Sequence, residues 1–316
     1  MNTLELHYYL DDNSHSMNAV VKNKSEAEFI KLFFEVSNLL DLDIDLEFEA
    51  LKEGGIKDII KYFKKKKNKQ KLEKLLIFFG AILSGVLINV TSDHFNKDKE
   101  LEELNKEEKR LNIRKLKNDL QQDSLSKAQE TVVIESIIIQ ISDTHKVQVF
   151  KSRFYQQILK EPKLYQFSTT ELDDNYKPLS NERSITRANF NKQILESEDL
   201  EPKTIENANI EIVSPVLKQG NMKWKGLYND KSISFYVNDT EFKNAVLNKQ
   251  YSFSSGTSIK CSLEIVVTLD DEGEEVIKEA KVFDVLEVFD GKQTHITKKA
   301  KHLKEMKNQI RMDFKE

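Results

Sequence analysis

Apolar and polar residues follow three different patterns in the first fifth of the chain. Residues 4–10 alternate, and turn-forming residues separate them from residues 17–22, so two strands are expected there. Over residues 25–40 the apolar positions recur every three or four residues, which predicts an amphipathic helix. Residues 43–50 alternate again and predict a third strand. These elements indicate a small α/β domain over residues 1–55.

An uncharged run of 16 residues, 75–90, stands out because 32% of the whole chain is charged. A helical stripe over residues 56–63 and a collar with eight lysines and one glutamate, residues 61–74, precede it. Spans of a bilayer need about 17 to 25 residues, and lysine clusters favour anionic lipid. The pattern predicts one long helix that runs into a single short membrane segment over residues 56–92. The alternative is a fully buried core helix.

Small residues inside this run are spaced four apart, as in helices that pack closely in lipid. A single amide near the end of the run could bond across a bundle, face a wet pore or simply be solvated. The residues expected to pack helices or line a pore are Gly80, Ala81, Ser84, Gly85 and Asn89.

The lysine collar is expected to contact the membrane surface. Positively charged flanks favour the cytoplasmic side, so the sequence predicts a protein of the bacterial inner membrane with its N-terminal domain in the cytoplasm. The lysines in question are Lys64, Lys65, Lys66, Lys67 and Lys69.

The middle of the chain is less regular. Residues 93–145 predict a charged helical linker, in which an oligomeric coiled coil and a single helix packed on another domain are both compatible with the leucine spacing. An apolar patch over residues 132–141 is a buried element whose type, helix or strand, periodicity does not decide. Residues 146–208 are expected to form an irregular connection with one helix.

The last third of the chain is rich in strand patterns. Residues 209–292 predict a β-rich domain with one helix at 238–249, capped by Asp239 or Thr240. Residues 293–316 predict a basic amphipathic tail. The expected fold class is therefore α+β: a small N-terminal α/β domain, a long helix entering a membrane segment, a charged linker helix and a β-rich C-terminal domain.

Composition and motifs argue against an enzyme. Cys261 is the only cysteine, the histidines lack metal-ligand spacing, and no phosphate-binding glycine loop is present. No cofactor or metal is expected. Catalytic groups that lie far apart in sequence would escape this search, so a hydrolase or nuclease with dispersed residues is a third hypothesis.

Binding chemistry is concentrated in the segment MKWKGLY, residues 222–228. In a strand, its lysines share one side, where they could hold phosphates while an aromatic ring stacks on a base. The alternative is that the tryptophan is a core residue and the lysines are ordinary surface. The ligand-binding candidates are Lys223, Trp224, Lys225, Tyr228 and Tyr236.

Three stretches of sequence, residues 17–40, 53–63 and 212–242, together with the single apolar segment, carry a resemblance to a known family. The chain resembles the membrane channel effectors of the Hailong type, found in bacterial anti-phage defence loci. The resemblance implies a homo-oligomer whose apolar helices form a pore. It also implies gating by a soluble domain that recognises a nucleotide or oligonucleotide made by a partner nucleotidyltransferase.

The expected function is thus a non-enzymatic, oligomeric membrane effector of anti-phage defence that forms or gates an ion-permeable pore. A soluble oligomeric binding or scaffold module, with the apolar helix buried in the assembly, is the alternative. A single span would place the two soluble parts on opposite sides of the bilayer. The segment would therefore be re-entrant or insert only on activation, unless the ligand site lies in the N-terminal domain.

Overall fold

The computed structural model divides the chain into two compact units, an N-terminal unit up to Glu198 and a barrel unit from Asp199 onward. Each unit has its own hydrophobic core. The structure describes residues 2–12, 16–49, 56–64, 79–84, 102–120 and 126–302.

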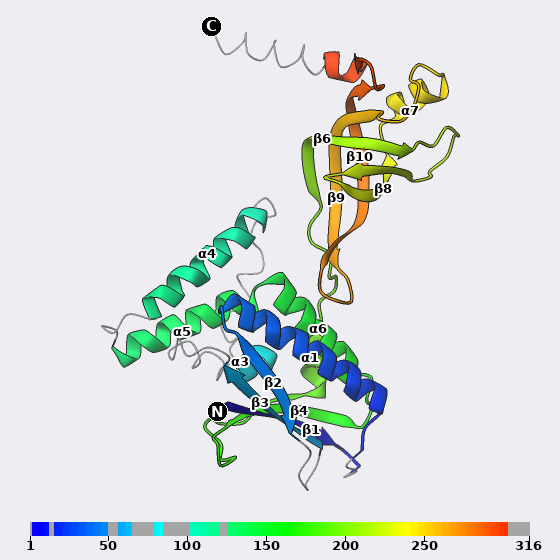
Figure 1. The fold of residues 1–316 in the computed structure, drawn as a ribbon. Helices are drawn as coiled ribbons and strands as arrows, with labels where there is room; N and C mark the ends of the chain where they lie inside the picture. Colours follow the sequence, from blue (N-terminus) through cyan, green and yellow to red (C-terminus); the bar gives the residue numbers. More distant parts are fainter. Residues whose placement is uncertain are drawn as a thin grey trace. The chain divides into compact units, whose positions relative to one another are not determined.

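The N-terminal unit is built on a five-stranded antiparallel sheet, sheet A, in the order β2-β3-β1-β4-β5. Helices cover one face of this sheet, and α1 and α6 pack against each other there (Figure 1). The strands are β1 (Asn2–Leu10), β2 (Ile44–Glu49), β3 (Ile56–Lys64), β4 (Leu164–Leu172) and β5 (Arg183–Thr186). The helices are α1 (Ala19–Leu39), α3 (Phe79–Ser84), α4 (Glu102–Leu120), α5 (Lys127–Ser142), α6 (His145–Ile158) and the 3-10 helix η3 (Arg187–Gln193).

The described part of the apolar run, residues 79–84, forms the short helix α3, and all six residues are buried. The Phe79 ring lies 4.9 Å from the Phe33 ring of α1, centroid to centroid. The Thr169 hydroxyl donates to the Gly80 carbonyl at 3.2 Å, and the Tyr155 hydroxyl donates to the Leu83 carbonyl at 2.9 Å. Here α3 is a core element of the N-terminal unit.

The predicted fold class is therefore wrong in its membrane part. Across the described ranges, no helix combines the length and apolar character needed to cross a membrane. The physical reason for the error is that a run of apolar residues satisfies a protein core as well as it satisfies lipid.

The helix predicted over residues 56–63 is also wrong, because this segment is strand β3. It lies between β2 and β1, with Ile60 opposite both Leu4 and Phe48. Neighbouring positions Asp58 and Ile59 are both buried, so the two faces of the strand are covered and alternation is lost.

The strand predicted over residues 17–22 belongs instead to the first turns of α1. The Asn18 side chain caps this helix by accepting hydrogen bonds from the backbone N–H groups of Val20 and Val21, at 2.9 and 3.2 Å. The Asn18 backbone N–H donates in turn to a carboxylate oxygen of Glu161 at 2.8 Å. The helix was predicted to begin at residue 25. Its cap, Asn18, lies seven residues earlier, so the helix is longer at its start than the periodicity indicated.

The charged linker contains the helices α4 and α5. The apolar patch at residues 132–141 lies in α5, so it is helical, and a capping box of Ser126 and Gln129 begins that helix. An oligomeric role for α4 stays a prediction.

The irregular connection predicted for residues 146–208 is wrong for its centre, which supplies β4, η3 and β5. The strand β4 is hard to recognise in the sequence because several of its buried residues are polar. Ser168 and Thr169 are fully buried, and Thr170 is nearly so. Strands of this kind lack the apolar alternation by which strands are recognised.

The barrel unit is a closed ring of five strands. Its pairings run β6-β7-β8-β10-β9 and back to β6, with β8 and β10 parallel and the other pairs antiparallel. This order, with a helix between the third and fourth strands, is that of the OB fold. The elements are β6 (Lys203–Ser214), β7 (Trp224–Tyr228), β8 (Lys231–Val237), α7 (Thr240–Leu247), β9 (Ser258–Leu269), β10 (Glu275–Phe289) and the short edge strand β11 (Thr294–Ile296).

Two local features allow the ring to close. The register of β6 shifts between Ile205 and Ala208, where Asn207 has a φ of 58°, so that β6 pairs with β9 and then with β7. Gly226 allows β7 to approach β6, since a Cβ there would lie 2.6 Å from the Glu211 carbonyl oxygen.

Large side chains fill the interior of the ring, and α7 closes one end of it. Trp224 is 1% exposed and its ring lies 6.0 Å from that of Phe242 on α7, centroid to centroid. The predicted helix at residues 238–249 is confirmed as α7. Its cap is Asp239, which accepts a hydrogen bond from the Phe242 backbone N–H at 2.9 Å.

Candidate ligand-binding sites

The outer face of β7 and β8 carries basic residues. In β7, exposed Lys225 follows buried Trp224, and exposed Lys223 comes just before it. Lys225 lies opposite Ser234 in the β7–β8 register. The strand therefore directs its lysines outward because its alternate residues fill the barrel.

An aromatic side chain lies beside these lysines. The Lys223 ammonium is 5.1 Å from the centroid of the Tyr236 ring, a cation–π distance. Neither Lys223 nor Lys225 makes an ion pair with another described residue. We call Lys223, Lys225 and Tyr236, with the β6–β7 loop, the β7–β8 face.

Two other ligand candidates lie differently. Trp224 is in the barrel core, so it cannot stack on a ligand from outside, and that part of the prediction is corrected by its burial. Tyr228 is half-buried and packs against the same core. Among the aromatic candidates, Tyr236 is the ring that the fold brings to the lysines.

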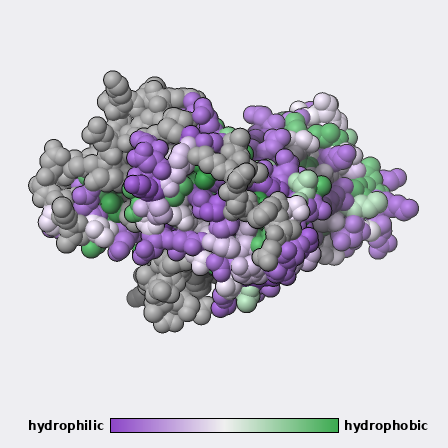
Figure 2. Space-filling model, turned by 90° about the horizontal axis from the view of Figure 1, so that it is seen from below, coloured by the Kyte–Doolittle hydropathy of each residue, from purple (hydrophilic) through white to green (hydrophobic). Residues whose placement is uncertain are grey.

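The β6–β7 loop contributes exposed apolar side chains to this face. Leu217 and Met222 are 65% and 47% exposed, and Lys218 is exposed between them. Figure 2 shows one face of the molecule, on which most of the described surface is hydrophilic and hydrophobic residues occur in small groups. The loop therefore offers apolar contact area beside positive charge.

The residues predicted for a pore have other surroundings. Gly80, Ala81 and Ser84 are buried in α3, where the Ser84 hydroxyl donates to the Ala81 carbonyl at 3.5 Å. Gly85 and Asn89 lie outside the described residues. Of the predicted membrane-surface lysines, Lys64 ends β3, and Lys65, Lys66, Lys67 and Lys69 lie outside the described residues.

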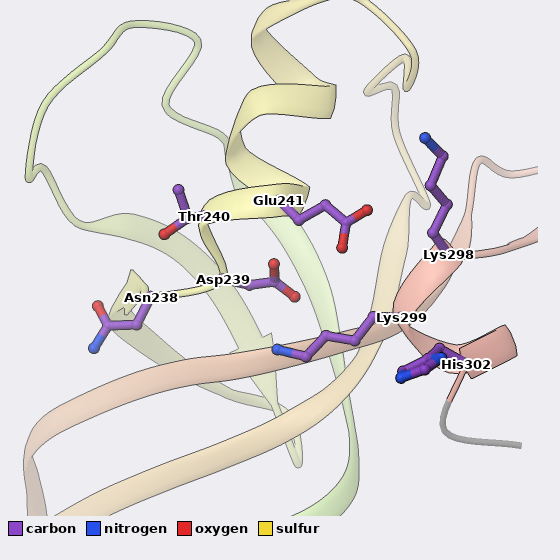
Figure 3. Close-up of a pocket in the computed structure, with 7 residues that line it drawn as sticks. All are labelled: Asn238, Asp239, Thr240, Glu241, Lys298, Lys299 and His302. Carbon is purple, nitrogen blue, oxygen red and sulfur yellow. The ribbon is translucent and has the colours of Figure 1, made fainter. Parts of the chain in front are cut away.

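A hollow of about 560 Å³ opens between the start of α7 and the segment after β11 (Figure 3). At its base, buried Asp239 accepts a second hydrogen bond, from the Val285 backbone N–H at 3.0 Å. Lys299 pairs with Asp284, which raises the pKa of that lysine. Its lining residues are Asn238, Asp239, Thr240, Glu241, Lys298, Lys299 and His302.

A second hollow of about 190 Å³ continues the first along α7. The two share Asp239, Glu241, Lys298 and Lys299, and the second extends to Tyr251 and to several amide side chains. We call the two together the α7 groove. The sequence does not reveal this groove, because its residues match no motif and come from segments about 60 positions apart.

The outer face of sheet A is a contrasting polar surface, because its side chains bond to one another. The Tyr9 hydroxyl donates to Glu182, and burial, together with this bond, raises the pKa of Tyr9 to about 12. The nearby hydroxyls of Ser168 and Tyr9 lower the pKa of Glu182. The Lys57 ammonium donates to Glu5 at 3.1 Å.

Other chemistry is absent from the described ranges. No group of three or more His, Cys, Asp or Glu side chains there could hold a metal ion. Burial raises the pKa of the Cys261 thiol to about 12, so this cysteine is not a reactive thiolate at neutral pH.

Comparison with known proteins adds no assignment to these surfaces. No family model matches the chain, and neither a curated protein nor a solved structure matches it.

Proposed function

We propose that the barrel unit binds single-stranded nucleic acid across the β7–β8 face. The strand order supports this proposal, because barrels of this order bind oligonucleotides on the face of their second and third strands and on the adjoining loops. The second and third strands here are β7 and β8. The proposal keeps the predicted recognition of an oligonucleotide. It leaves out a pore formed by the apolar run, since α3 packs in a core.

The observation that carries the proposal is the Lys223 ammonium over the Tyr236 ring on that face. A phosphate group would attract the ammonium away from the ring, and a base would replace it on the ring. Both contacts use side chains that are exposed or half-buried, so binding would require no unfolding of the barrel. Stacking of a base on an aromatic side chain is worth about 1 to 3 kcal/mol.

The lysines of the face supply the electrostatic part of the affinity. Lys223, Lys225 and Lys218 lie on β7 or on the loop that leads to it. Each phosphate contact to a single strand contributes about 0.7 to the slope of log affinity against log salt. Three contacts predict a slope of about −2.

The test is fluorescence anisotropy of labelled single-stranded DNA and RNA with the purified full chain. Exchanging both Lys223 and Lys225 for Glu should weaken binding by about 10-fold or more, because attraction to phosphate becomes repulsion. Tyr236→Leu should weaken binding by about 10-fold through lost stacking.

The matched control is Lys292→Glu, an exposed lysine in the β10–β11 turn away from β7 and β8. It changes the charge of the chain in the same direction without touching the face. Equal affinity of wild type and the double variant, or an equal loss in the control, would show that the β7–β8 face does not bind nucleic acid.

A further inference from the structure

The α7 groove holds unengaged polar side chains of both charges on facing walls. Glu241 extends from α7 toward the segment that carries Lys298, with His302 farther along that segment (Figure 3). Glu241 and Lys298 are exposed, and neither makes an ion pair with another residue that the structure describes. Asp239 and Lys299, in contrast, already have hydrogen-bonded partners, so they build the walls.

The order of chemical groups along the groove is informative. Lys298 and the Glu241 carboxylate line both hollows, His302 lines only the first, and the half-buried ring of Tyr251 lines only the second. Three amide side chains, which can both donate and accept, lie with that ring: Asn244, Asn248 and Gln250.

We propose that the α7 groove binds a ribonucleoside monophosphate. The phosphate would contact Lys298 and His302, the two ribose hydroxyls would donate to the Glu241 carboxylate, and the base would lie against Tyr251. Carboxylates are common partners of ribose hydroxyls, and amides can pair with the edges of bases. The larger hollow, of about 560 Å³, falls in the size range of small-ligand sites, and the hollow of about 190 Å³ extends it.

This site is separate from the β7–β8 face in residues and in ligand. It goes beyond the proposed function, because it would bind a small nucleotide between α7 and the segment after β11. A failure of oligonucleotide binding would therefore leave it standing.

Isothermal titration calorimetry of the full chain tests the proposal with AMP, GMP, CMP and UMP as probes. Their 2′-deoxy counterparts, ribose 5-phosphate and inorganic phosphate complete the series. We expect the ribonucleotides to bind about 10-fold more tightly than the deoxynucleotides, since a hydrogen bond to a charged group is lost. Ribose 5-phosphate and phosphate should bind more weakly still.

Two variants separate the contacts. Glu241→Gln should bring the ratio of ribonucleotide to deoxynucleotide affinity close to one, whereas Lys298→Ala should weaken every phosphate-containing probe. Lys292→Ala is the matched control for the loss of a lysine and should change nothing. All three positions are exposed, so the barrel should stay folded.

Three results would overturn the proposal. One is the absence of binding of all four ribonucleotides at millimolar concentration. Another is phosphate alone binding as tightly as the nucleotides, which would remove the base and ribose contacts. The third is an unchanged ribose preference in Glu241→Gln.

Discussion

The two sheets of this protein resemble each other on their inner faces and differ on their outer faces. Inside, each packs large aromatic side chains against a helix: Phe79 of α3 over sheet A and Phe242 of α7 at the barrel. Outside, Tyr176 of the N-terminal unit has the Lys61 ammonium over its ring and donates to both oxygens of Glu49 at 2.8 Å. Among the described residues, Tyr236 has the Lys223 ammonium over its ring and no such hydrogen bond.

This difference separates polar surfaces that stabilise the fold from surfaces that can serve a ligand. Charges that bond to neighbours have already exchanged water for protein partners, and a ligand would have to break those bonds. The lysines beside the half-buried Tyr236 ring keep their hydration, and they lose little free energy when a phosphate replaces water. The β7–β8 face belongs to the second kind.

The largest expected effects test the likeness of the two inner faces. Phe79→Ala should lower the free energy of unfolding of the N-terminal unit by about 3 to 5 kcal/mol, since a fully buried ring is removed. Phe235→Ala should do the same to the barrel unit. Urea unfolding followed by circular dichroism measures both.

Trp224 is the only tryptophan, so its fluorescence reports the barrel unit alone. Phe79→Ala should leave the fluorescence transition unchanged, and Phe235→Ala should shift it. A loss below about 1 kcal/mol for Phe79→Ala would contradict the placement of α3 in a core.

Two glycines sharpen the comparison of how tightly each unit is packed. Gly226→Ala should cost about 2 to 3 kcal/mol, because its Cβ would meet the Glu211 backbone oxygen at 2.6 Å and strands would have to separate. Gly80→Ala should cost less, about 1 to 2 kcal/mol. Its neighbours at 2.6 and 2.9 Å are buried side-chain atoms of Thr169 and Glu171, which would have to shift, but no backbone is displaced and alanine favours a helix.

Thermal unfolding of both variants measures this order. A larger loss of stability in Gly80→Ala than in Gly226→Ala would mean that the paired strands β6 and β7 separate at a lower energetic cost than α3 and sheet A.

Matched tyrosine substitutions test the outer faces. Tyr176→Phe should lower the free energy of unfolding by about 1 to 2 kcal/mol, since Glu49 loses a hydrogen bond. Tyr236→Phe should change it by less than about 0.5 kcal/mol. Chemical denaturation of the two variants gives the values, and equal losses would remove the distinction between the two faces.

The smallest expected effect is a dependence of stability on pH at the outer face of sheet A. The hydroxyls of Ser168 and Tyr9 hold the pKa of Glu182 below its ordinary value of 4.5. The resulting stability is fully present above pH 4.5 and is lost as the pH falls through the lower folded-state pKa. Glu182→Gln should therefore be less stable than wild type near neutral pH, and the gap should close in acid.

Urea midpoints between about pH 6 and pH 3 measure this gap. Tyr9→Phe should reduce the pH dependence, because it removes the hydrogen bond that Tyr9 donates to Glu182. A constant gap across this range would show that Glu182 has the same pKa in the folded and unfolded states.

Part of the candidate site could be predicted from the sequence. The alternation in MKWKGLY places Lys223 and Lys225 on the side opposite Trp224 in any strand, and the structure has them so. The cation–π contact with Tyr236 required the β7–β8 pairing as well. The α7 groove could not be predicted, because its two walls are brought together by contacts of β10 with Asp239 and with Thr297.

Local chemistry in the sequence determined β1, β2, the presence of α7 and most strands of the barrel, because turn residues and alternation act over a few positions. Tertiary structure alone decided the nature of β3 and of α3. Both are apolar on several sides, and such segments take the form of whatever surrounds them. Ile56–Lys64 is a strand because it pairs with a strand on each side. Phe79–Ser84 is a helix that packs against Phe29 and Phe33, where burial of its apolar side chains stabilises the N-terminal unit.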